Sequence, residues 1–85
     1  MVYIDGLKMI KTKILELIKI KDKVSRGDLQ GMAETISMRI APADWEMQND
    51  ISNRILIIVD NSQNFNDVQL DHHIKNLERD IKNYR

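Results

Sequence analysis

The strongest pattern of apolar positions lies at the C-terminal end of the chain. Five apolar residues there recur at spacings of four, three, four and three, which places them on one stripe of an α-helix: Leu70, Ile74, Leu77, Ile81 and Tyr84. Asn66 is positioned to cap this helix, and Gln69 three residues later completes a capping box. Phe65 before the cap and Leu70 after it occupy the positions of a hydrophobic staple. The pattern predicts that the stretch 65–85 is a helix with one buried face.

The N-terminal part of the chain carries a second helical pattern, over residues 7–20. Its lysines fall on the polar faces, and its apolar residues lie at helical spacing: Leu7, Ile10, Ile14, Leu17 and Ile18. Leu15 and Ile20 widen the apolar surface beyond a single stripe. We therefore expect this helix to be covered on more than one side.

The next pattern predicts a helix over residues 26–40. Ser25 is a suitable N-cap, and Asp28 three residues later suits the helix dipole. One stripe then continues through Leu29, Met32, Ala33, Ile36 and Ile40. Gly27 and Gly31 either weaken the helix by about 1 kcal/mol each relative to alanine or mark a close approach of two backbones.

Pro42 ends that helix, because proline disfavours helical geometry at the preceding residue, and it is accepted in the first turn of the next helix. Beyond it, a third helix is predicted by the stripe Met47, Ile51, Ile55, Ile58 and Val59. The β-branched run 55–59 is also compatible with a buried strand, for which residues 2–4 are the obvious partner. We favour the helix, because a lone pair of short strands is marginal in water.

Together these elements predict an all-α fold, an antiparallel four-helix bundle formed by a single domain over residues 1–85. The less favoured alternative is an α+β fold with a two-stranded element from 2–4 and 55–59. The chain has no cysteine, which excludes disulfides and thiol chemistry. Its N-terminus does not resemble a secretory signal, and its longest apolar run is too short to cross a bilayer. We expect a cytoplasmic domain that does not bind membranes.

The formal net charge is zero, but the charges are unevenly distributed. Between residues 8 and 26, two acids accompany seven basic residues: Lys8, Lys11, Lys13, Lys19, Lys21, Lys23 and Arg26. Between residues 41 and 74, Arg54 is the only lysine or arginine. The six acids of this segment are Asp44, Glu46, Asp50, Asp60, Asp67 and Asp71. A basic flank suggests an anionic partner and an acidic flank a cationic one. The alternative is a solvated surface whose oppositely charged ends attract each other.

No residue pattern predicts catalysis or metal binding. His72 and His73 are adjacent, so on a helix they point about 100° apart and cannot share a metal ion. Asp67 and Asp71 have helical spacing but no third ligand. The serines lack the glycines of a nucleophile elbow, and the glycines form no phosphate-binding loop. We expect a protein that is not an enzyme and has no cofactor and no metal.

The segments Lys13-Ile14-Leu15-Glu16-Leu17-Ile18-Lys19 and Val24-Ser25-Arg26-Gly27-Asp28-Leu29 resemble the first two helices of winged-helix and helix-turn-helix regulators. That resemblance implies DNA binding, for which the available cations are Lys11, Lys13, Lys19, Lys23 and Arg26. The family requires a basic recognition helix next in sequence. Here that place is acidic and would be repelled by phosphate, so DNA binding is the second hypothesis.

The motif Phe65-Asn66-Asp67, followed by Leu70-Asp71, Ile74 and Leu77, resembles the small immunity proteins that neutralise colicin D-type and contact-dependent toxins. The resemblance extends to the length and the four helices of the whole chain, and it implies an acidic surface that covers the basic cleft of a nuclease toxin. The corresponding residues here are Asp44, Trp45, Glu46, Asp50, Asp60, Asp67 and Asp71.

Trp45 has two interpretations: an aromatic hot spot between acids, or an ordinary core or helix-end anchor. The acidic segment 41–74, together with the resemblance to immunity proteins, gives the leading hypothesis: a non-enzymatic module that binds a basic protein partner. A third hypothesis is a small oligomerisation protein, because zero net charge and five methionines permit self-association.

Overall fold

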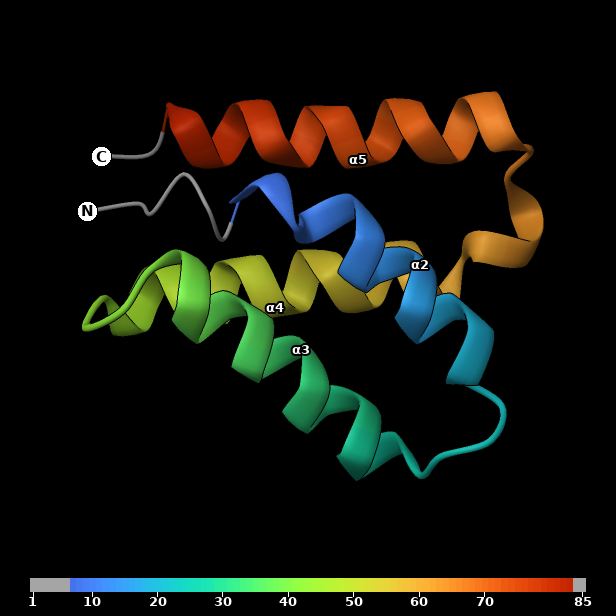
Figure 1. Ribbon diagram of the computed structural model, residues 1–85, viewed down its shortest axis with the longest axis horizontal. Helices are drawn as coiled ribbons and strands as arrows, with labels where there is room; N and C mark the ends of the chain where they lie inside the picture. The colour runs from blue at the N-terminus through green and yellow to red at the C-terminus, as the bar shows by residue number, and fades with distance from the viewer. Residues whose placement is uncertain (1–6, 84–85) are drawn as a thin grey trace.

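The computed structural model describes residues 7–83, and it confirms the all-α antiparallel four-helix bundle (Figure 1). The four helices are α2 (Ile10–Ile20), α3 (Arg26–Ile40), α4 (Trp45–Asp60) and α5 (Asp67–Lys82), and a short 3-10 turn, η1 (Ser62–Asn64), links the last two. The shortest dimension of the molecule is 18 Å, which corresponds to two layers of helices. No helix among the described residues is both long and apolar enough to cross a membrane.

Polar side chains cap three of the four helices at their N-termini. The backbone N–H of Asp28 donates to Ser25 Oγ at 3.1 Å, which confirms the predicted start of α3. At α5 the predicted capping box is complete, because Asn66 and Gln69 each accept a hydrogen bond from the backbone N–H of the other. On the stripe of α5, Ile74, Leu77 and Ile81 are buried as expected and Leu70 is partly buried, while Tyr84 lies outside the described residues.

The turn between α3 and α4 differs from the prediction. Pro42 is not in the first turn of α4, because Asp44 is the N-cap and the helix begins at Trp45. Ala43 instead adopts a left-handed conformation with φ of 66°. The chain therefore leaves α3 at Ala41 and reverses over three residues, and Pro42 serves the reversal because its fixed φ suits a turn.

The core is built mainly from isoleucine and leucine on the predicted stripes. Among the largest side chains that are almost wholly buried are Ile10, Ile14, Ile40, Met47, Ile51, Ile55, Ile74 and Leu77. The run 55–59 lies inside α4, so the strand alternative is wrong for this segment; its proposed partner, 2–4, lies outside the described residues. Helical geometry buries four of the five residues of the run, whereas Ile57 remains 60% exposed.

Helix α3 packs most extensively against α4, and two of the buried residues of α3 have small side chains. Ala33 and Ser37, one turn apart, are both fully buried. The Ser37 hydroxyl donates a hydrogen bond to the Ala33 carbonyl at 2.9 Å, so this buried polar group has a partner. Gly31 is different: it is exposed, and an added Cβ would meet nothing within 4 Å. Gly31 therefore does not mark a close approach of two backbones, and the other interpretation, a residue that weakens α3 relative to alanine, remains.

Candidate protein-binding surfaces

The first two turns of α4 carry an exposed tryptophan and two exposed carboxylates. Asp44 fixes the first turn, because its side chain accepts a hydrogen bond from the Met47 backbone N–H at 3.0 Å. Trp45 is 78% exposed and thus lies outside the core. Glu46 and Asp50 are exposed on the same side of the helix, one turn apart, and neither forms an ion pair within the described part of the chain. We call Trp45, Glu46 and Asp50 the α4 patch.

Two other acids of the predicted surface are engaged in ion pairs between helices. Asp60, the last residue of α4, accepts hydrogen bonds from both terminal guanidinium nitrogens of Arg26, with 2.9 Å between Nη2 and Oδ2. This pairing raises the pKa of Arg26 above its ordinary value. Asp71 accepts from Lys11 Nζ at 2.9 Å and pairs with Lys75 Nζ at 3.0 Å. The hydrogen bond from Lys11, followed by that from Lys75, lowers the pKa of Asp71. The hydrogen bond between Lys11 and Asp71 also raises the pKa of Lys11.

The predicted acidic residues therefore form two groups and not one surface. The 16 residues of α4 span about 24 Å, with the α4 patch at the N-terminal end and Asp60 at the other. Asp67 is exposed in the first turn of α5, directly after the link that joins it to Asp60, and Asp71 follows one turn later. In Figure 1 the α3–α4 turn and the α4–α5 link lie at opposite ends of the molecule. Within residues 7–83, the α4 patch combines carboxylates that form no ion pair with an exposed tryptophan in the same two turns.

The cations considered for DNA binding are largely engaged as well. Three of the five pair with carboxylates: Lys11 with Asp71, Lys13 with Glu16, and Arg26 with Asp60. Lys19 and Lys23 are exposed and form no ion pair within residues 7–83. The basic flank thus attracts acids of its own molecule, as the alternative interpretation of the charge pattern expects.

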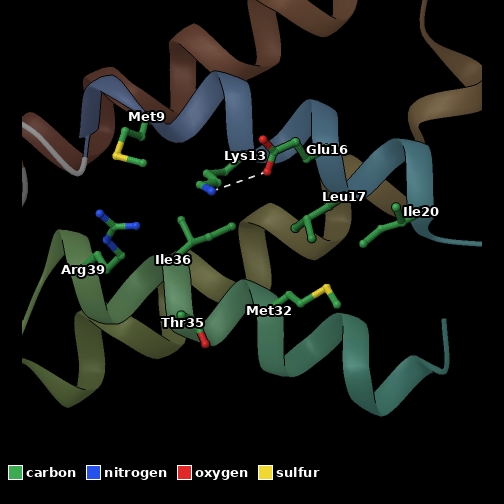
Figure 2. Close-up of a pocket in the computed structure, with 9 residues that line it drawn as sticks. All are labelled: Met9, Lys13, Glu16, Leu17, Ile20, Met32, Thr35, Ile36 and Arg39. Atoms are coloured by element: carbon green, nitrogen blue, oxygen red, sulfur yellow. Dashed lines mark ion pairs between the residues drawn. The ribbon is translucent and has the colours of Figure 1, made fainter.

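Sequence reasoning missed a groove of about 250 Å³ between α2 and α3 (Figure 2). One wall comes from α2 and its N-cap and the other from α3, and the lining residues are Met9, Lys13, Glu16, Leu17, Ile20, Met32, Thr35, Ile36 and Arg39. The groove is open on one side, and most of its lining is apolar. The sequence feature that indicates this groove is the apolar surface of α2 beyond its main stripe, because Ile20 belongs to that surface and lines the groove.

The two histidines lie on the outside of α5. The imidazole of His73 stacks on the Phe65 ring, with 4.4 Å between the centroids, while His72 meets His73 edge-on at 6.2 Å. Throughout residues 7–83 no three histidine, aspartate or glutamate side chains converge in a way that could hold a metal ion. The described surface thus offers the α4 patch and an apolar groove as candidate binding sites.

No protein-family model, no curated protein and no solved structure matches this chain.

Proposed function

We propose that the protein is a non-enzymatic, cytoplasmic binding module of the immunity or inhibitor kind, which uses the α4 patch to bind a basic protein partner. One observation carries the proposal: Trp45 is 78% exposed in the same two turns of α4 as Glu46 and Asp50, two carboxylates that no cation of the described chain neutralises. Tryptophan is enriched among the residues that dominate interface energies, especially where polar groups surround it.

Charge complementarity gives the partner its chemistry. Unpaired carboxylates on a rigid helix attract a cationic surface, speed the encounter and fix the register of the complex. The catalytic cleft of a nuclease is cationic because it holds phosphate, so a nuclease toxin would meet this requirement. Asp60 and Asp71 support the proposal less, because Arg26, Lys11 and Lys75 already neutralise them.

The test is a charge reversal of the patch, Glu46→Lys with Asp50→Lys. Asp44 is left intact because it caps α4, so the helix should persist and circular dichroism should be unchanged. The probes are cationic nuclease domains of secreted toxins from the same genome, in binding and nuclease-inhibition assays. We expect the native chain to bind and inhibit one of them, and the double variant to lose about a hundredfold or more in affinity.

A matched control reverses two exposed acids away from the patch, Asp22→Lys with Glu34→Lys, and makes the same change in net charge. We expect this control to bind like the native chain. Equal binding by the patch variant, or equal loss in both variants, would contradict the proposal. No observation favours the DNA-binding hypothesis, for which a mobility shift that weakens steeply with salt would be the signature.

A further inference from the structure

The groove between α2 and α3 has the length and openness to accept one face of a helix. Its α2 wall follows a helix of 11 residues, which is roughly 16 Å or three turns. An amphipathic helix of the same length presents apolar side chains at positions i, i+4 and i+7 to such a groove. The volume of about 250 Å³ lies below the range of about 300–1,000 Å³ typical of pockets that enclose a small molecule. Entry of side chains from a larger partner suits this shape better.

The lining of the groove is apolar and adaptable. Leu17 and Ile36 are buried, and they face each other from the two helices. Met9 and Met32 contribute one half-buried thioether from each wall. Methionine is unbranched and polarizable, so it repacks around different side chains and is common in grooves that bind helices.

Two cations mark one end of the groove. Lys13 and Arg39 extend toward it from opposite walls near Met9, as Figure 2 shows. Lys13 has Glu16 at 3.5 Å, a long contact, and Arg39 forms no ion pair with any residue in 7–83. A partner's carboxylate placed beside Arg39 would pair with a cation that no acid among the described residues neutralises, whereas Lys13 already pairs with Glu16, which also lines the groove.

We infer that this groove is a docking site for an amphipathic helix of another protein, whose acidic residue beside its apolar stripe pairs with Arg39. The inference goes beyond the proposed function, because the groove attracts an acidic partner and the α4 patch a basic one. One molecule would then present two interfaces of opposite charge preference.

The helices described in residues 7–83 of a second copy do not supply the required apolar face. The apolar stripes of its described helices are buried in their own core. The large apolar residues that remain exposed in 7–83 are scattered over three helices: Met38, Trp45, Ile57 and Val68. Trp45 and Ile57 share α4 but lie twelve residues apart, which does not make a stripe.

The test uses a synthetic amphipathic helical peptide of about 16 residues, long enough for several turns, with a leucine stripe flanked by glutamates. Its matched control has lysines in place of the glutamates. Each is titrated into the ¹⁵N-labelled protein and followed by amide chemical shifts. We expect saturable shifts at the residues that line the groove, with the glutamate peptide binding about tenfold or more tightly than the lysine peptide.

Two variants assign the contacts. Arg39→Glu should weaken the glutamate peptide about tenfold, whereas Lys19→Glu, the same charge change on an exposed part of α2 outside the groove, should weaken it far less. Thr35→Trp, which fills the groove without changing charge, should abolish the shifts. Absence of saturable shifts, shifts elsewhere, or indifference to Arg39→Glu would overturn the inference. So would tighter binding of decanoate than of peptide, or concentration-dependent shifts of the groove without any ligand.

Discussion

At the scale of single residues, small side chains on α3 have opposite roles. Ala33 and Ser37 are fully buried where α3 packs beside the other helices, so a larger side chain at either position would force overpacking. Gly31 faces open space, and nothing in the structure uses its lack of a side chain. The spacing of residues in the sequence identified the stripe of α3. It did not separate the buried small residues, Ala33 and Ser37, from the exposed Gly31, because all three are small residues of one helix.

Gly31→Ala should therefore stabilise the protein. Alanine loses less backbone entropy than glycine on forming a helix, and the new methyl group has no neighbour to clash with. We expect the free energy of unfolding to rise by about 0.5–1 kcal/mol, measured by urea denaturation. Gly27→Ala serves as the comparison and should gain less, because it lies in the first turn of α3, near the Ser25 hydroxyl. A decrease for Gly31→Ala would show that the position is constrained.

At the scale of elements, local capping chemistry determined how much could be predicted. The start of α3 at Ser25 and the start of α5 at Asn66 were both predictable, because each cap satisfies backbone N–H groups with a residue type suited to the task. The run 55–59 was ambiguous, because its β-branched residues suit strands as well as buried helices. The structure resolved it: Ile55 and Val59 are buried, whereas Ile57, which a strand would place on the same face as both, is 60% exposed. The α3–α4 turn was mispredicted because Pro42 is accepted both in turns and in first helical turns.

Removal of the α5 cap is the corresponding test. Asn66→Ala deletes the acceptor of the Gln69 N–H, whose hydrogen bond is 2.8 Å long, and leaves that donor to water. We expect a loss of about 1 kcal/mol in the free energy of unfolding. Gln69→Ala removes only the reciprocal bond to the Asn66 N–H and should cost less. Equal stability of Asn66→Ala and the native chain, by thermal and urea unfolding, would show that the capping box contributes nothing.

At the scale of the whole molecule, charges that looked like two flanks in sequence meet across the bundle. Lys11 joins α2 to α5 through Asp71, Arg26 joins α3 to α4 through Asp60, and Arg54 joins α4 to α5 through Asp80. The composition of each flank was readable from sequence, but the pairing depends on which helices become neighbours. The same reason limited prediction of the site. Trp45, Glu46 and Asp50 were predictable from one local segment, whereas the groove requires side chains from two helices.

The Asp71 pairs give the bundle a pH dependence that can be tested. Hydrogen bonds from Lys11 and Lys75 lower the pKa of Asp71 below its ordinary value of 3.8, so the folded state favours the carboxylate more than the unfolded state does. Its stabilising contribution is thus fully present above the unfolded pKa and is lost as the pH falls through the lowered folded pKa. Asp71→Asn should be less stable than the native chain at about pH 7, and the difference should shrink toward about pH 2.

Urea midpoints measured across this range, at low and high salt, provide the readout. The difference should also shrink with salt, because the Asp71 side chain is 31% exposed and its ion pairs are partly screened. Asp50→Asn is the matched control: Asp50 is exposed and forms no ion pair among the described residues, so its substitution should change the acid limb of the stability profile little. An identical pH profile for Asp71→Asn and the native chain would mean that the α2–α5 pairing contributes nothing to the fold. A profile altered by Asp50→Asn instead would assign a structural role to the α4 patch and weaken its assignment as a free binding surface.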